Sequence, residues 1–133
     1  MSNPFNYTYN VNDPREFLQE VSEHYANVDF CKDASPSDIL SYAERELSRI
    51  PNISTYINEV NEKTGESEMT FVFGWECTDD VELMADWFQL LRRLGGDCEN
   101  HRNHKGQTAM EVARARIHRL GYTDEDLIEM MKS

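Results

Sequence analysis

Cysteine is scarce in this chain of 133 residues, and the three that occur are Cys31, Cys77 and Cys98. An odd number of cysteines at such wide spacings argues against a disulfide framework. Long apolar runs are missing as well, since no stretch approaches the roughly 20 apolar residues of a membrane-spanning helix. The start of the chain also lacks the basic region and apolar stretch of a secretory signal. These absences predict a cytoplasmic protein with reduced thiols and no membrane partner.

Catalytic motifs are missing too. The sequence has no glycine-rich phosphate-binding loop, no Gly-x-Ser-x-Gly turn and no His-Glu-x-x-His helix. The nearest approach to a metal site is Cys98-x-x-His101-x-x-His104, to which Cys77 or His118 would have to add a fourth zinc ligand. Structural zinc normally shows paired ligands at compact spacings. We therefore expect no enzymatic activity, no metal and no cofactor.

Basic residues are few in the first two thirds of the chain. Asp and Glu number 25 against 13 Lys and Arg, for a formal net charge of −12. Residues 1–86 hold 18 acidic and 5 basic residues, whereas residues 87–133 hold 7 and 8. This asymmetry favours a basic protein as partner of the N-terminal part and disfavours direct contact with nucleic acid.

Length and composition suit one compact domain, residues 1–133, with a single core. Its acidic part, residues 1–78, carries two helix signals, in which Asp13-Pro14 and Ser35-Pro36 each place an N-cap before a proline. Pro51 ends the second helix. Apolar residues recur at helical spacing after both signals, first Phe17, Val21, Tyr25 and Val28, then Ile39, Ala43, Leu47 and Ile50. Ahead of these helices, residues 5–9 fit either an ordered arm or an edge strand.

The apolar period changes from helical to alternating between Ile53 and Trp75. Ile53, Thr55 and Ile57 alternate with their neighbours, and a polar turn follows at residues 62–65. After the turn, Met69, Phe71, Phe73 and Trp75 would share one face of a strand. The pattern predicts a β-hairpin whose aromatic face packs on the two helices, because an isolated hairpin is marginal in water.

A longer apolar helix is predicted from about Asp79 to Leu94. Thr78 or Asp79 can cap it, and Arg92 and Arg93 in its last turn suit the helix dipole. Its apolar residues form two adjoining stripes, Val81, Met84, Phe88 and Leu91 beside Leu83, Trp87, Leu90 and Leu94. So wide an apolar arc indicates a central helix buried on two sides.

The last third, from Leu90 to Met131, reads as a helix, a turn and two further helices. The first helix ends in a glycine pair, Gly106 closes the polar turn, and Thr108 opens the next helix with Glu111 placed to complete a capping box. A last helix runs from about Asp124 to Met131. This module resembles a single divergent ankyrin repeat. The residues on the family's pattern are Gly95, Gly96, Asp97, Gly106, Thr108, Met110 and Ala113.

The departures from that family shape the expected fold. Ala109 and Glu111 replace its usual Pro and His, and about four extra residues separate the two helices of the module. A single repeat cannot bury its own apolar face. We therefore expect a mainly helical α+β domain in which residues 79–133, the central helix and the ankyrin-like helix pair, pack on the N-terminal helices and hairpin.

Acidic residues cluster along the expected hairpin and the start of the central helix. Carboxylates in such a row could imitate the phosphates of a duplex, which carries one charge per ~1.7 Å of its axis. In composition the chain also resembles small acidic DNA mimics of the phage type. The alternative is an acidic surface that serves only solubility. The candidate partner-binding residues are Glu59, Glu62, Glu66, Glu68, Glu76, Asp79, Asp80, Glu82 and Asp86.

These features predict a non-enzymatic inhibitor or adaptor whose acidic cluster docks on a basic, nucleic-acid-handling protein, as in anti-restriction or anti-CRISPR proteins. An immunity protein that neutralises a toxic nuclease would have the same electrostatics. A third hypothesis is an ankyrin-like interaction scaffold with incidental acidity. That scaffold would bind through Arg102, His104, Arg114 and Arg116.

Overall fold

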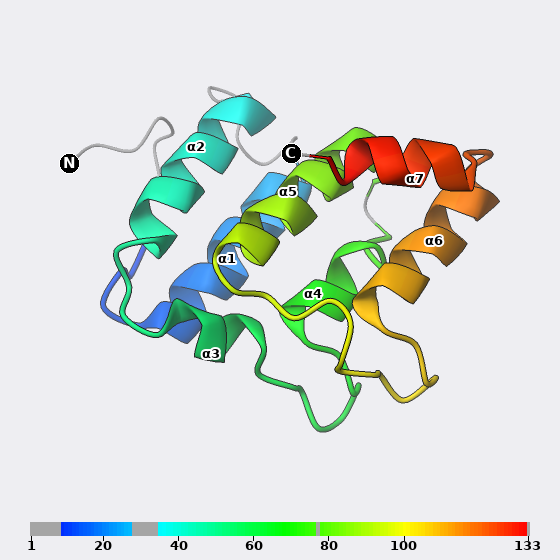
Figure 1. The fold of residues 1–133 in the computed structure, drawn as a ribbon. Coiled ribbons are helices and arrows are strands. Elements are labelled where there is room, and N and C mark those ends of the chain that lie inside the picture. The colour runs from blue at the N-terminus through cyan, green and yellow to red at the C-terminus, as the bar shows by residue number, and fades with distance from the viewer. Residues whose placement is uncertain (1–8, 28–34, 77, 133) are drawn as a thin grey trace.

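The structure is a computed structural model, and it describes residues 9–27, 35–76 and 78–132. Over these residues it contains seven helices and no strand. The helices are α1 (Pro14–Ala26), α2 (Pro36–Leu47), α3 (Ile53–Ile57), α4 (Glu68–Val72), α5 (Val81–Arg93), α6 (Ala109–Arg119) and α7 (Asp124–Met130). The predicted α+β class is therefore wrong, because the described chain is all helical (Figure 1). None of these helices is long and apolar enough to cross a membrane.

Two short helices, α3 and α4, stand where the hairpin was predicted. Met69 and Phe73 are fully buried, whereas Phe71 is 51% exposed, so the three do not share a face as they would in a strand. The four-residue spacing of Met69 and Phe73 fits a helical turn as well as a strand. Ser67 decides for the helix, because its side chain closes a capping box at the start of α4. The predicted turn before Gly65 is present, but it joins helices.

The helices predicted from their start signals are confirmed, with small shifts at the ends. Asp13, Ser35 and Thr108 each cap the helix that follows them. The cap of α5 is Asp80 and not Thr78 or Asp79, and α2 ends at Leu47. The predicted stripe position 28, the arm or strand at positions 5–8 and Cys77 lie outside the described residues.

Helix α5 lies at the centre of the fold, with α1 and α2 on one side and α4 on the other (Figure 1). Trp87, Phe88 and Leu91 of this helix are fully buried. Tyr25 of α1 stacks on Trp87 with 4.9 Å between ring centres, and its hydroxyl donates to the Leu83 carbonyl at 2.7 Å. The prediction of a central helix buried on two sides is confirmed.

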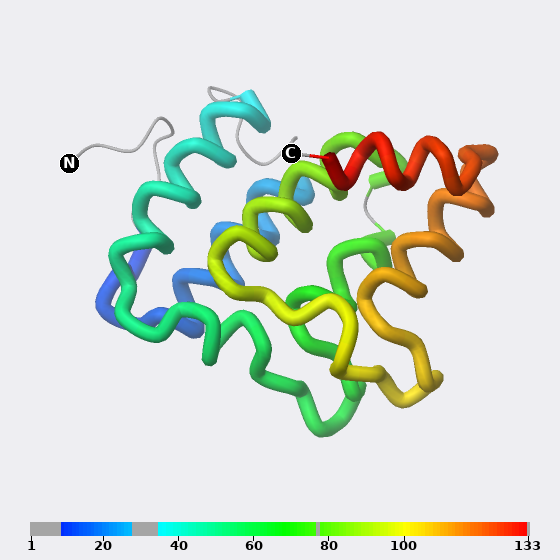
Figure 2. Tube along the Cα trace, viewed as in Figure 1, coloured from blue at the N-terminus to red at the C-terminus, as the bar shows by residue number. Residues whose placement is uncertain are grey.

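The C-terminal part of the fold is built from two helix pairs. Helix α4 packs against α5, α6 packs against α7, and the two pairs contact each other through α4 and α6. The loops that precede α4 and α6 lie at the same end of the molecule, as the chain trace shows (Figure 2). The second pair is the one that the sequence predicted from Thr108 onward, and the first was not predicted.

The two loops that lead into α4 and α6 share one design. Each begins at an asparagine, Asn61 or Asn103, whose side-chain oxygen accepts two backbone N–H groups. Each ends at a glycine of positive φ, Gly65 at 73° or Gly106 at 77°. In both, the N-cap two residues later closes a capping box. Gly106, which the sequence placed at the close of the polar turn, thus has a counterpart in Gly65, and the loop and helix pair that begin at Asn103 have a structural counterpart beginning at Asn61.

Candidate functional site

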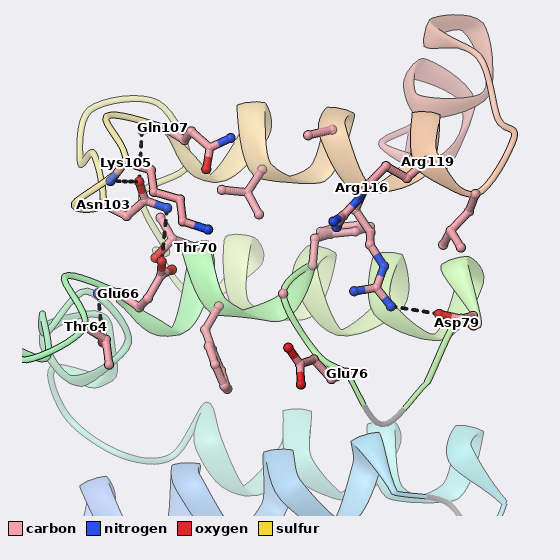
Figure 3. A pocket seen from close by; sticks show the side chains of 16 residues that line it. Thr64, Glu66, Thr70, Glu76, Asp79, Asn103, Lys105, Gln107, Arg116 and Arg119 are labelled. Atoms are coloured by element: carbon pink, nitrogen blue, oxygen red, sulfur yellow. Dashed lines mark hydrogen bonds and ion pairs between the residues drawn. The ribbon is translucent and has the colours of Figure 1, made fainter.

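Two hollows adjoin on α4, and Phe71 belongs to the lining of both. We call the larger one the α4–α6 groove; it has a volume of about 840 Å³ and is lined by residues of α4, α6 and their preceding loops (Figure 3). We call the smaller one the α1–α4 hollow; it has a volume of about 390 Å³ and lies between α1, the chain after α3, and α4. The half-exposed Phe71 ring therefore stands where the two hollows meet.

The α4–α6 groove carries charges of both signs. Arg116 donates to the Asp79 carboxylate at 3.0 Å and to the Thr78 carbonyl at 2.8 Å, and only 10% of its side chain is exposed. Arg116 thus ties α6 to the segment before α5 and neutralises Asp79 (Figure 3). Glu76, Lys105 and Arg119 also line the groove, and none of them forms an ion pair within the described chain. These three charges are free to meet a partner.

One side of the α1–α4 hollow is occupied by an internal arginine. Arg15 of α1 grips the Glu59 carboxylate with two hydrogen bonds, its Nε lying 2.6 Å from Oε1. The same guanidinium lies 5.8 Å from the centre of the Tyr56 ring, within range of a cation–π interaction. The pKa of Glu59 is lowered by the hydrogen bonds and charge of Arg15. This side of the hollow is electrostatically satisfied.

Glu66 joins the two hollows and the two loops. Its Oε1 accepts a hydrogen bond of 3.0 Å from Asn103 Nδ2, and nearby His101 Nε2 lies 3.0 Å from the Gly65 carbonyl oxygen. The other carboxylate oxygen, Oε2, is buried and has no hydrogen-bond partner among the described residues. Leaving a buried acceptor unpaired costs about 1–3 kcal/mol, more if it is charged. Oε2 of Glu66 is therefore closed off from solvent as well as unpaired, and Glu66 ties the two loops together through Oε1.

Glu68, at the start of α4, also lines the α1–α4 hollow. Burial raises the pKa of its carboxyl to about 7, and the nearby Glu23 carboxylate of α1 raises it as well. No described lysine or arginine forms an ion pair with Glu68 or Glu23. The Glu23 and Glu68 carboxyls thus add negative charge to the hollow, and no described lysine or arginine compensates it.

The remaining predicted acids lie elsewhere. Asp80 accepts a hydrogen bond from the Leu83 amide at 3.1 Å and has a structural role as the cap of α5. Glu82 and Asp86 line a third hollow of about 380 Å³ toward α7. The pKa of Asp86 is raised, chiefly by burial and then by Glu82 and Asp80. Glu62 is exposed in its loop and lines none of these hollows.

The nine predicted acids therefore do not form one row. The hairpin that would have aligned them like a phosphate track is not present in the described chain. Glu59, Glu66 and Glu68 line the α1–α4 hollow, Glu66, Glu76 and Asp79 line the α4–α6 groove, and Glu82 and Asp86 line the third hollow. The structure instead brings about half of them together around Phe71.

The alternative basic residues are mostly engaged within the chain. Arg102 donates to Glu111 at 2.8 Å and to the Gly106 carbonyl at 2.7 Å, and Arg114 donates to Asp124 at 2.9 Å. Arg116 is held by Asp79, as described above. His104 lies against Gly65, where an added Cβ would come within 2.3 Å of its ring. These contacts give the four residues structural roles.

The Cys98-x-x-His101-x-x-His104 spacing gains no geometric support. Cys98 is buried, and His118, a possible fourth ligand, lies 2.6 Å from Asp124. Within residues 9–27, 35–76 and 78–132, no group of three or more His, Cys, Asp or Glu side chains is placed to hold a metal ion.

Several residues of the site were not predicted from the sequence. Glu23 and Tyr56 lie far from α4 in the sequence and reach the hollow only through the fold. Phe71 was assigned to a buried face and is half exposed. Asn103 could have been found, because an asparagine shortly before Gly65 and another shortly before Gly106 mark the repeated loop.

Comparison with known proteins identifies no family, so the fold alone defines the class of this protein. No protein-family model matches the chain, and neither a curated protein nor a solved structure matches it significantly. The class that the fold defines is a small helical protein, in which two helix pairs with matching entry loops follow two N-terminal helices.

Proposed function

We propose that this protein is a non-enzymatic inhibitor or adaptor that docks its acidic surface on a basic, nucleic-acid-handling protein. The observation that carries the proposal is the setting of Phe71. This half-exposed ring lies where the two hollows meet, and their linings hold four carboxyls that form no ion pair within the described chain. They are Glu23, Glu66, Glu68 and Glu76.

Interfaces are enriched in aromatic side chains, so an exposed ring beside two hollows suits the centre of a protein-binding surface. Unpaired carboxylates around it would select a partner of opposite charge and speed its approach. The net charge of −12 adds long-range attraction toward basic proteins and repels nucleic acid itself. Nucleic-acid-handling proteins present basic patches of this kind. Targets of anti-restriction, anti-CRISPR and immunity proteins all belong to this class of partner.

An ankyrin-like scaffold is the second candidate, and the repeated loop and helix pair favours it. In this hypothesis the two helix pairs from Asn61 onward are ankyrin-like units, and the α4–α6 groove receives the partner. Lys105 and Arg119 would then carry the contact, since both line the groove without an ion pair in the described chain. Arg102, Arg114 and Arg116 would serve the fold.

A pair of matched charge reversals tests the proposal. Glu62→Lys with Glu76→Lys changes two exposed acids, one in the loop before α4 and one in the lining of the α4–α6 groove, and Glu99→Lys with Glu125→Lys makes the same charge change elsewhere. With the partner captured from the native host, the first variant should lower the association rate at low salt by about tenfold or more. The second should lower it by less than about threefold, because it affects only the overall field.

Neither variant should unfold the protein, since exposed charge changes away from caps shift stability by about 0.5 kcal/mol or less, and reversing Glu125 in the first turn of α7 costs about 1 kcal/mol. Equal effects of the two variants would overturn the proposed site. The scaffold hypothesis would replace the proposed site if the Glu62 and Glu76 variant bound the partner normally while Lys105→Glu and Arg119→Glu abolished binding.

A further inference from the structure

The α1–α4 hollow already shows which ligand chemistry it accommodates. In part of its lining, the Arg15 guanidinium is held by the Glu59 carboxylate and lies over the Tyr56 ring. This arrangement combines the two contacts that suit a guanidinium best, a two-pronged carboxylate bond and an aromatic face. The contacts of Arg15 thus show how an arginine side chain can be held at this surface.

The lining of the hollow also holds the same two kinds of group without an internal partner. Glu23 and Glu68 supply carboxyls, and Phe71 supplies a half-exposed ring. The Glu68 carboxyl is largely buried, lies close to Glu23 and forms no hydrogen bond within the described chain, which is an observation independent of the charge count. No described lysine or arginine pairs with either carboxyl. The site therefore offers acceptors and an aromatic face to a cationic donor.

We propose that the α1–α4 hollow binds an arginine side chain of the partner protein, with Glu23 and Glu68 accepting from its guanidinium and Phe71 packing on it. This inference rests on the proposed function and names the contact by which the basic partner is recognised. A volume of about 390 Å³ suits one long side chain. A metal ion would need clustered ligands, and no such cluster of three occurs among residues that the structure describes.

Arginine fits better than lysine for a geometric reason. A guanidinium carries five N–H donors in a planar fork, so it can reach two carboxyls and stack on a ring at once. An ammonium is a compact, strongly hydrated charge that cannot bridge groups in this way. The hollow presents separate carboxyls on α1 and on α4, which favours the wider donor.

Occupation by a guanidinium should also release a proton near neutral pH. The Glu68 carboxyl, with a pKa of about 7, is partly protonated there, and a nearby cation would favour its ionised form. The other charged groups facing the hollow are Glu23 and Arg15 from α1, Glu59 after α3, and Glu66. Arg15 and Glu59 already neutralise each other, so the proton should come mainly from Glu68.

The test is a nuclear magnetic resonance titration of the full chain with capped tripeptides. Ala-Arg-Ala should produce saturable shifts of backbone amides in residues 19–23 and 66–72. Ala-Lys-Ala should bind more weakly, and Ala-Gln-Ala should not saturate. Glu68→Gln should weaken Ala-Arg-Ala binding about tenfold, and Phe71→Ala should weaken it severalfold, whereas the exposed Glu125→Gln should not.

Conserved amide spectra away from the hollow will show that the variants are folded. Equal binding of the arginine and glutamine peptides, shifts confined to other regions, or an unchanged affinity of Glu68→Gln would each overturn the inference. If the arginine peptide fails while the Glu62 and Glu76 reversal still weakens partner binding, the inference falls and the proposed function stands. If the peptide binds but partner capture is insensitive to that reversal, the proposed function falls instead.

Discussion

Replacing Glu68 with Gln should raise the free energy of unfolding at pH 8 by on the order of 3 kcal/mol and change it little at pH 4. Burial, and then the Glu23 carboxylate, raise the pKa of Glu68 from its ordinary 4.5 to about 7. Above neutral pH the folded protein therefore contains an ionised Glu68 carboxylate that is buried and close to the Glu23 carboxylate. A glutamine of the same shape carries no such charge.

The pH window follows from the two pKa values of Glu68. Between about 4.5 in the unfolded chain and about 7 in the folded one, the folded state binds more protons. Stability should therefore fall as pH rises through this window and level off above it. Asp86, whose pKa is also raised, titrates in both proteins and cancels in the difference.

Urea unfolding of the wild type and Glu68→Gln between pH 4 and pH 8 measures this effect. Glu99→Gln, at an exposed loop position, is the matched control, and its effect on stability should vary much less with pH than that of Glu68→Gln. A Glu68→Gln difference of the same size at every pH would contradict the account. A stabilising change that weakens arginine binding would mark Glu68 as a residue that serves binding at the expense of stability.

Gly65→Ala should lower the free energy of unfolding by about 3 kcal/mol, whereas Gly106→Ala should lower it by about 1 kcal/mol. Both glycines have positive φ, which an alanine adopts only with strain. They differ in their surroundings. A Cβ on Gly65 would lie 2.8 Å from the backbone nitrogen of His104, whereas a Cβ on Gly106 would meet nothing within 4 Å.

The difference arises because the His104 ring can rotate away but its backbone cannot move without disturbing the second loop. Gly65 thus sets the close approach of the two loops, and with it the position of Glu66 in the site. Chemical denaturation of both variants measures the two losses. Equal losses would show that the loops are not in contact as described.

The parts of the fold that could be predicted from the sequence are those with a local signal, such as a helix cap. Helices α1, α2, α6 and α7 begin at a capping residue whose side chain bonds to the first turn of the same helix, so the start of each helix is encoded locally. The hairpin prediction failed because Met69 and Phe73 fit either period. The decision for a helix came from Ser67 and Thr70, a capping pair not used in the prediction.

The site was predictable only in part, because it depends on contacts between distant segments. The sequence places Glu66, Glu68 and Glu76 close together in the chain, and the structure keeps them near α4. It could not reveal that Asp79 is neutralised by an arginine of α6 or that Glu23 of α1 faces Glu68. Pairing and burial, and not the number of carboxylates, decide which acids are available to a partner.

The central claim is that a basic partner docks on the surface around Phe71. Amide hydrogen exchange of the full chain, alone and in complex with the captured partner, tests it most directly. We expect amide hydrogen exchange to slow on binding in residues 15–23 and 66–76, with little change in α7. Protection confined to α7 or to residues 102–114, with residues 66–76 unchanged, would contradict it.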